Sequence, residues 1–209
     1  QDALDQARDD GVPVFLATDH VDVRRVGAGE AGDHGDAGAE DPHVWTDPAS
    51  MERVVAALGV ALRRDAGLAL GPQVAAERGR LTALDRETAR TLGAIPPDRR
   101  RLVPGHESLG YFARRYGLEV VGAVIPGLSS QGGVSADALA RLKQRIEAAG
   151  VDVVFAEAGT PRQVAEAIAS ETGARVVELA VETMPPDGRY ATYMHQLAGT
   201  VASALAPRP

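Results

Sequence analysis

Short apolar segments alternate with amphipathic stretches after Arg100, and this alternation constrains the fold more than any other feature of the chain. The apolar segments have the length of strands, and the stretches between them run for roughly 10–15 residues with helical periodicity. Strands joined through helices form βαβ units, in which the strands are parallel. The expected strands are RRLVP, LEVVGAVIP, VDVVFAE and ARVVELA, and the expected helices are HESLGYFARRYG, SADALARLKQRIEAAG, PRQVAEAIASETG and YATYMHQLAGTVASAL.

The first part of the chain has the pattern of another α/β unit. Residues 2–9 are predicted to form a helix, and VPVFLA (residues 12–17) a strand. Residues 24–42 are rich in Gly, Ala and Asp and lack any period, which predicts a mobile loop. A helix with Asp47 or Ser50 as its N-cap should follow. Its apolar stripe would be Met51, Val54, Val55, Leu58 and Leu62.

A long polar helix is predicted over residues 73–93, and a helix with so thin an apolar face often bridges two lobes. We therefore predict an α/β fold of two parallel-sheet lobes joined by one long rigid helix. The first lobe would cover residues 1–71, the connecting helix 72–96 and the second lobe 97–209. Since a domain rarely starts on a helix without a preceding strand, we expect the first lobe to be incomplete and upstream residues to be missing.

Composition narrows the classes of function. The formal net charge is −7, whereas binding to nucleic-acid phosphates requires a basic surface, so we expect no nucleic-acid partner. The sequence has no Cys, which excludes disulfides and Cys-based zinc sites. It also has no run of 18 apolar residues, the length expected of a transmembrane helix.

The candidate functional residues follow strands, because ligands of open parallel sheets bind beyond the carboxyl ends of the strands. His43, His106 and an acid, either Glu182 or Asp187, lie at such junctions. Imidazole and carboxylate together form a suitable ligand set for Zn²⁺ or Mn²⁺. The sequence therefore predicts a metal site in a cleft that these junctions share.

The segment EDPHVWTDP around His43 is suited to holding a ligand in a fixed direction. Pro42 restricts the backbone, and Trp45 can pack under the loop. Asp41 and Asp47 can accept the second ring N–H of a ligand histidine. Glu157, at the end of an expected buried strand, can orient a residue of the cleft or cap a neighbouring backbone group instead of binding metal.

Each residue also has a more ordinary explanation. A loop histidine such as His43 is more often solvated than bound to metal. His106 can hydrogen-bond the next helix, and Asp187 followed by Gly188 is typical of a turn.

Five segments follow one another along the chain. They are EDPHVWTDP, VPGHESLGYFARRYGLEVVG, GLSSQGGVSADALARL, VDVVFAEAGTPRQVAEAIASETGARVVEL and YATYMHQL. With these segments, in this order, the chain resembles the zinc/manganese-type solute-binding proteins of bacterial ABC importers. The first is similar to that family's DPH-x-W-x-[DN]-P segment, and the second to its His-containing segment followed by Y-F-x-x-x-Y-G-L. The resemblance covers nearly the whole chain.

The resemblance implies one metal ion between two lobes, held by four protein ligands. The second ligand would be His43, the third His106 and the fourth Asp187, with Glu182 as the alternative because the alignment slips in this loop. The first ligand would be a histidine that precedes residue 1. His34 lies where the family often carries a His-rich loop.

The resemblance also implies the function. We expect a monomeric extracytoplasmic receptor, periplasmic or anchored as a lipoprotein, that delivers Zn²⁺ or Mn²⁺ to the membrane permease of an ABC importer and is not an enzyme. Nitrogen-rich ligands favour Zn²⁺ over Mn²⁺. A zinc-dependent hydrolase and a surface adhesin of the same family are the alternatives.

Overall fold

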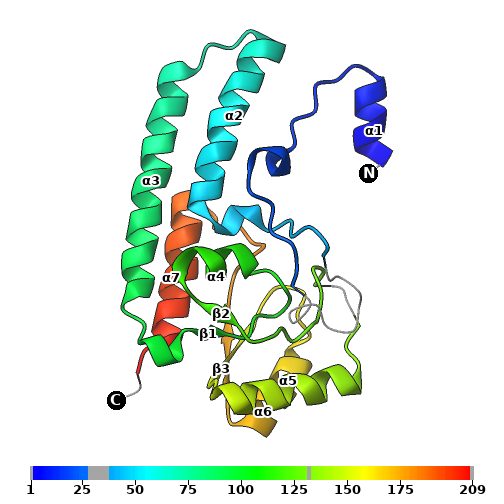
Figure 1. Ribbon diagram of the computed structural model, residues 1–209, viewed down its shortest axis with the longest axis vertical. Coiled ribbons are helices and arrows are strands. Elements are labelled where there is room, and N and C mark those ends of the chain that lie inside the picture. Colours follow the sequence, from blue (N-terminus) through cyan, green and yellow to red (C-terminus); the bar gives the residue numbers. More distant parts are fainter. Residues whose placement is uncertain (1, 28–37, 131–132, 208–209) are drawn as a thin grey trace.

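The computed structural model describes residues 2–27, 38–130 and 133–207 (Figure 1). The middle of the predicted loop 24–42, including His34, lies outside the described residues. Its two ends are joined by an antiparallel bridge between Arg25 and Glu40.

Two long helices run antiparallel along one side of the molecule, and the second continues beyond the first towards the opposite end (Figure 1). They are α2 (Pro48–Ala66), which Asp47 caps, and α3 (Gly71–Gly93). Gly59 allows the two helices to approach closely, because a Cβ at this position would lie 2.6 Å from a side-chain carbon of Val74. Both predicted helices are thus confirmed, although the boundaries of the lobes stay a prediction.

The region before α2 differs from the prediction. Helix α1 (Asp2–Asp9) is present and stands apart from the rest of the molecule in Figure 1. The strand predicted over residues 12–17 is wrong, since this segment is extended without pairing and runs into a 3₁₀ turn, η1 (Ala17–His20). An apolar run forms a strand only where another strand can satisfy its backbone groups, and no partner strand for it lies in residues 2–27, 38–130 or 133–207.

The second part of the chain contains the parallel strands that the alternation predicts. β1 (Arg101–Leu102) pairs with β2 (Glu119–Val120), and β3 (Val153–Ala156) pairs with β4 (Arg175–Glu178), both in parallel. The amide of Phe155 donates to the carbonyl of Val103 at 2.8 Å, which links the two pairs side by side. The intervening elements are η3 (Pro97–Arg99), α4 (Gly110–Tyr116), α5 (Ala136–Ala149), α6 (Arg162–Thr172) and the closing helix α7 (Tyr190–Leu205).

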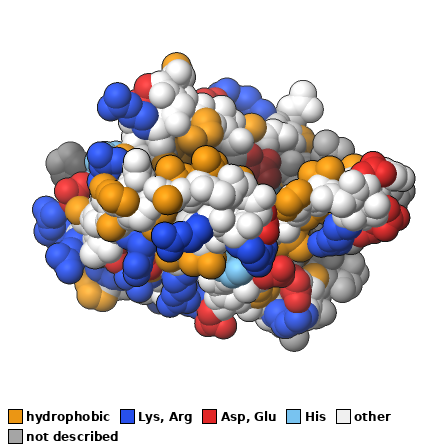
Figure 2. All heavy atoms as spheres, turned by 90° about the horizontal axis from the view of Figure 1, so that it is seen from above, with side chains coloured by type: hydrophobic (Ala, Val, Ile, Leu, Met, Phe, Trp, Pro, Cys, Tyr) orange, Lys and Arg blue, Asp and Glu red, His pale blue; other side chains and the backbone are white. Residues whose placement is uncertain are grey.

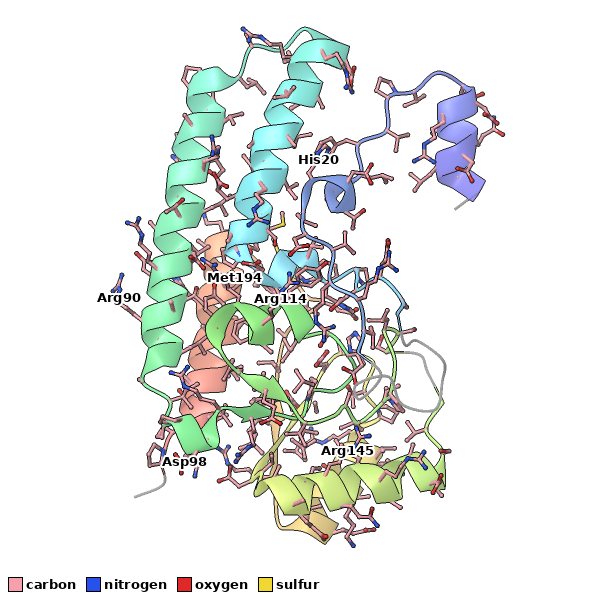
Figure 3. All side chains as sticks on the ribbon, in the orientation of Figure 1. His20, Arg90, Asp98, Arg114, Arg145 and Met194 are labelled. Carbon is pink, nitrogen blue, oxygen red and sulfur yellow. The ribbon has the colours of Figure 1, made fainter. Side chains whose placement is uncertain are left out.

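Apolar side chains fill both faces of these strands. α5 and α6 cover one face, whereas α4 and α7 pack on the other, and the lower half of α3 lies along α7 (Figure 1). Met194 of α7 is fully buried there, while Arg90 points from α3 into solvent (Figure 3). Buried side chains of α3 facing the core are few: Leu81, Leu84, Thr88 and Leu92.

The surface mixes charged and apolar groups. Seen from above, side chains of both charge signs lie beside exposed hydrophobic ones (Figure 2). Across the described residues, no helix is both long enough and apolar enough to span a bilayer.

Candidate metal centre

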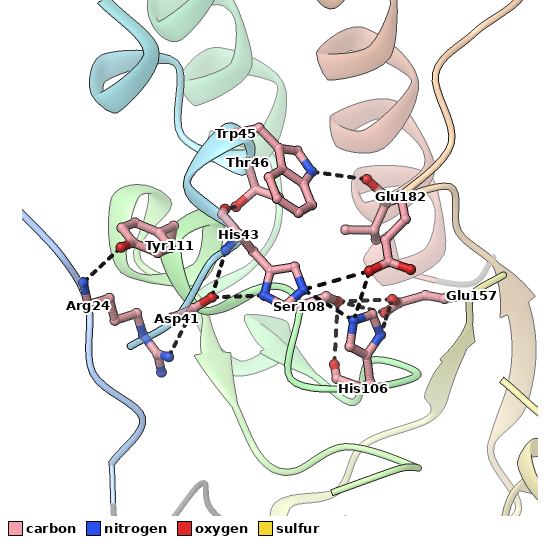
Figure 4. A network of polar contacts seen from close by, with 11 residues as sticks. Arg24, Asp41, His43, Trp45, Thr46, His106, Ser108, Tyr111, Glu157 and Glu182 are labelled. Atoms are coloured by element: carbon pink, nitrogen blue, oxygen red, sulfur yellow. Dashed lines mark hydrogen bonds and ion pairs between the residues drawn. The ribbon is translucent and has the colours of Figure 1, made fainter. Parts of the chain in front are cut away.

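His43 is buried and held by an acidic partner. It precedes the short turn η2 (Val44–Thr46), and its side chain is 1% exposed. Its Nδ1 lies 2.8 Å from Oδ1 of Asp41, and its backbone amide donates to the same oxygen at 2.9 Å. Arg24 donates to the other oxygen of Asp41 at 3.0 Å. These contacts fix the direction of the imidazole (Figure 4).

His106 has an equivalent partner on a different segment. It follows β1 and is fully buried, and its Nδ1 lies 2.8 Å from Oε2 of Glu157 at the end of β3. Glu157 is itself fixed, because it accepts from the amide of Gly105 at 2.9 Å and from the hydroxyl of Ser108 at 2.9 and 3.0 Å. This geometry agrees with the predicted role of Glu157 in orienting a residue of the cleft.

The Nε2 atoms of the two histidines converge on one point. They lie 3.2 Å apart, and Oε1 of Glu182 lies 3.5 Å from Nε2 of His106 and 3.9 Å from Nε2 of His43. Donors at about 2.0–2.1 Å from a tetrahedral zinc ion are separated by about 3.3 Å. Among the described residues, His43, His106 and Glu182 form the one group of three or more His, Asp or Glu whose donor atoms lie close enough to share a metal ion.

The hydrogen bonds of the two histidines favour a cation at the point where their Nε2 atoms meet. An ionised carboxylate only accepts, so Asp41 and Glu157 favour the tautomer in which each histidine carries its proton on Nδ1. Both Nε2 atoms then present lone pairs to each other and to the carboxylate of Glu182. A proton or a metal ion between them removes this repulsion.

The electrostatics of the pocket point the same way. Burial alone would lower the pKa of His106, but the contact with Glu157 and the charges of Glu157, Glu182 and Glu107 raise it above its ordinary value. Burial raises the pKa of the neighbouring Glu107 to about 7. The carboxylates around His106 therefore favour positive charge on its imidazole, while Glu107 itself is only partly ionised near pH 7.

The other acidic candidates lie elsewhere. Asp187 is exposed at the start of α7, where its carboxylate accepts from the amide of Arg189 at 3.0 Å and from the hydroxyl of Thr192 at 2.7 Å. Those bonds lower the pKa of Asp187. Asp47 caps α2 instead of contacting a histidine. The structure thus brings together His43, His106 and Glu182, and it does not bring Asp187 to them.

Sequence reasoning missed Arg24 and Ser108. Arg24 is separated from Asp41 by the Gly-rich loop, and its role depends on Gly110, where a Cβ would lie 2.4 Å from the guanidinium. Ser108 is two residues from His106, a spacing that by itself carries no signal.

Known proteins that resemble this chain are zinc-binding and zinc-uptake proteins. The family model described as zinc-uptake complex component A, periplasmic, matches residues 1–204. The zinc-binding protein TroA of Treponema pallidum (strain Nichols) is 28% identical over 179 residues, which are 79% of this chain and 58% of the relative. The high-affinity zinc uptake system protein ZnuA of Paracoccus denitrificans (strain Pd 1222) is 30% identical over 173 residues, 79% of this chain and 52% of the relative.

A solved structure shares the fold. The periplasmic zinc-binding protein TroA from Treponema pallidum superposes with a TM-score of 0.70 at 25% identity, covering 88% of this chain and 70% of that one. The chain spans a little over half the length of the two curated relatives. The match of the family model over almost all of its residues shows that the chain belongs to the family of periplasmic zinc-uptake component A.

Proposed function

We propose that this chain binds one Zn²⁺ ion through Nε2 of His43, Nε2 of His106 and a carboxylate oxygen of Glu182, and that it serves as the extracytoplasmic receptor of an ABC importer. The observation that carries the proposal is the convergence of three donor atoms, each pair separated by 3.2 to 3.9 Å. Two relatives are named for zinc binding and zinc uptake. The receptor would act outside the cytoplasm and pass the ion to a membrane permease.

Glu182 is the better candidate for the acidic ligand. Its carboxylate faces both imidazoles, whereas the carboxylate of Asp187 is already engaged at the start of α7. A ligand must give up its existing bonds to reach a metal, and Asp187 would lose two.

Zinc is favoured over manganese by the donor set. Two imidazole nitrogens and one carboxylate oxygen suit a tetrahedral zinc ion, while Mn²⁺ prefers a larger number of oxygen donors. Both imidazoles are also fixed by carboxylates, which strengthens them as ligands.

The names of the relatives, zinc-binding protein and zinc uptake system protein, favour binding over catalysis. A zinc hydrolase needs a water molecule in an open metal position and a general base beside it. Three donors leave one tetrahedral position for a water or for a further protein ligand. Zinc-dependent hydrolysis of ester or phosphoester probes would support the hydrolase, and tight zinc binding without turnover would support the receptor.

The test is a calorimetric titration of the purified protein with Zn²⁺ and with Mn²⁺. We expect one zinc ion per chain, bound more tightly than manganese, and a large loss of affinity in His43→Ala, His106→Ala and Glu182→Ala. Asp187→Ala should retain binding. His195→Ala is a matched control, since this exposed histidine contacts Glu87 on α3, away from the site.

Unchanged zinc binding in both His43→Ala and His106→Ala would contradict the proposal. Loss of binding in Asp187→Ala with retention in Glu182→Ala would show that the acidic ligand is misassigned. Thermal unfolding of each variant without metal separates loss of a ligand from loss of the fold.

A further inference from the structure

The backbone carbonyl of Val181, the residue before Glu182, accepts two hydrogen bonds. The indole N–H of Trp45 donates to it at 3.2 Å, and the hydroxyl of Tyr193 donates at 2.9 Å. Val181 and Tyr193 are almost fully buried. Trp45 belongs to the loop of His43, so this carbonyl joins the segments that carry two of the three metal-facing side chains.

A further hydrogen bond connects the loop of His43 to α7. The hydroxyl of Tyr190 donates to the backbone carbonyl of Trp45 at 2.7 Å, while the indole N–H of Trp45 makes the bond to the Val181 carbonyl that is dashed in Figure 4. Tyr190 and Tyr193 lie in the first turn of α7, one helical turn apart, and their rings stack with centroids 6.0 Å apart. Burial raises the pKa of both phenols, so both hydroxyls stay protonated and able to donate.

The two bonds to the Val181 carbonyl restrict the backbone from which the Glu182 side chain leaves. The carbonyl of Val181 and the amide of Glu182 belong to one planar peptide group, so two bonds to that carbonyl fix the plane from which Glu182 leaves. The Glu182 side chain is 36% exposed, and within the described part of the chain its carboxylate contacts only the two imidazoles. Its position therefore depends on its backbone.

We propose that Trp45, Tyr190 and Tyr193 form a clasp of positioning residues that sets the distance between Glu182 and the two histidines, and thereby the preference of the site for zinc. This inference rests on the proposed function. His43 and His106 are buried and each has its own carboxylate partner, so the clasp acts chiefly on the exposed third ligand. Without the clasp, the carboxylate samples positions that do not suit a small tetrahedral ion.

Through Trp45 the clasp also connects the metal site to α7, because Tyr190 of α7 donates to the carbonyl of Trp45. The ring of Trp45 lies edge-on to the ring of His43, with centroids 5.1 Å apart. Trp45 is the sole tryptophan of the chain, so its fluorescence reports on the clasp without interference from another tryptophan.

The test uses Tyr193→Phe and Tyr190→Phe, which remove one hydroxyl each and keep the rings. The matched control is Tyr116→Phe, which removes a largely buried hydroxyl that donates to Asp85 on α3 at 3.2 Å. We expect zinc affinity to fall by roughly 10-fold in each clasp variant, the lower end for groups that orient metal ligands. Manganese affinity should change less, so the ratio of zinc to manganese affinity should narrow.

A double-mutant cycle with Glu182→Ala distinguishes positioning from general destabilisation. If the clasp acts through Glu182, Tyr193→Phe in the Glu182→Ala background should change zinc affinity by less than about twofold. The fluorescence change of Trp45 on zinc addition should also be smaller in the clasp variants than in Tyr116→Phe.

Three results would overturn the clasp. They are zinc affinity within twofold of wild type in both clasp variants, an equal loss in Tyr116→Phe, and an equal loss with and without Glu182. If zinc affinity falls in His43→Ala and His106→Ala but is unchanged in the two tyrosine variants, the proposed function stands and only the clasp fails. If zinc affinity is unchanged in the histidine variants, the proposed function and the clasp both fail.

Discussion

Replacing Glu157 by Gln should weaken zinc binding although Glu157 does not face the metal position. Its Oε1 accepts from the amide of Gly105 and the hydroxyl of Ser108, so a glutamine would place its carbonyl oxygen there. Its NH₂ group would then face Nδ1 of His106, in place of Oε2 at 2.8 Å. An NH₂ group donates, so His106 would have to accept on Nδ1 and carry its proton on Nε2, the atom that faces the metal.

The expected loss of zinc affinity in Glu157→Gln follows from the interactions of His106 that the substitution changes. Loss of a group that orients a metal ligand typically costs 10–100-fold in metal affinity. Here the substitution removes a negative charge next to His106 and also favours its wrong tautomer, so we expect a loss near 100-fold, which corresponds to about 2.7 kcal/mol. Ser108 would keep its hydrogen bond to the new carbonyl, so the fold should be retained.

The assay is competition for zinc against a fluorescent chelator at pH 7.5, with thermal unfolding of the metal-free protein measured alongside. Glu178→Gln is the matched control, because that carboxylate is exposed at the end of β4 and contacts Arg162. A loss below about threefold in Glu157→Gln, with the fold intact, would refute the claim that Glu157 sets the tautomer of His106.

Three further predictions concern pH and stability. Zinc affinity should fall as pH falls, because protons compete with zinc for the Nε2 atoms. Since the pKa of His106 is raised, this fall in affinity should begin above the ordinary histidine pKa of about 6.5. Calorimetric titration at several pH values checks it. The pKa of Glu107 is 4.5 in the unfolded chain and about 7 in the fold, so its neutral carboxyl contributes stability to the metal-free protein at low pH, and this contribution is lost as pH rises through 7. Glu107→Gln should therefore be more stable than wild type at pH 7.5, by up to about 3 kcal/mol in urea unfolding, with little difference at pH 4.5. An equal effect at both pH values would contradict this. Asp47→Ala should lower the free energy of unfolding by about 1–2 kcal/mol, because Asp47 accepts from the amide of Ala49 and the hydroxyl of Ser50 at the start of α2, while zinc affinity should stay unchanged in the same titration.

The helices and the parallel strands could be predicted because their signals are local. Ser135 caps α5 and Gly150 ends it in the left-handed conformation, and the apolar period between them is helical. The same locality explains the error at residues 12–17. The run VPVFLA has the composition of a strand, but pairing depends on a neighbouring strand from elsewhere in the chain, and composition does not encode that neighbour.

His106 can be predicted as a site residue because it follows β1, and strand ends converge at one edge of a parallel sheet. The same argument fails for His43, since no named strand precedes it in the described residues, and its prediction depends on the stiff neighbours Pro42 and Trp45. The acidic metal ligand is harder to predict from sequence, because Glu182 and Asp187 lie in one loop. Which of the two faces the histidines depends on the backbone conformation between them. Pro185 and Gly188 close a turn, with the amide of Gly188 donating to the carbonyl of Pro185, and this turn sends Asp187 to the start of α7. Contacts over long sequence separation, such as that of Trp45 with Val181, leave no pattern in a single sequence.

The most direct test of the account is a crystal structure of the zinc-loaded protein, with anomalous scattering recorded at the zinc absorption edge. The account predicts one strong anomalous peak, about 2.0–2.2 Å from Nε2 of His43, Nε2 of His106 and a carboxylate oxygen of Glu182. A peak bound to Asp187, a peak away from both histidines, or no peak from protein that binds zinc in solution would contradict it.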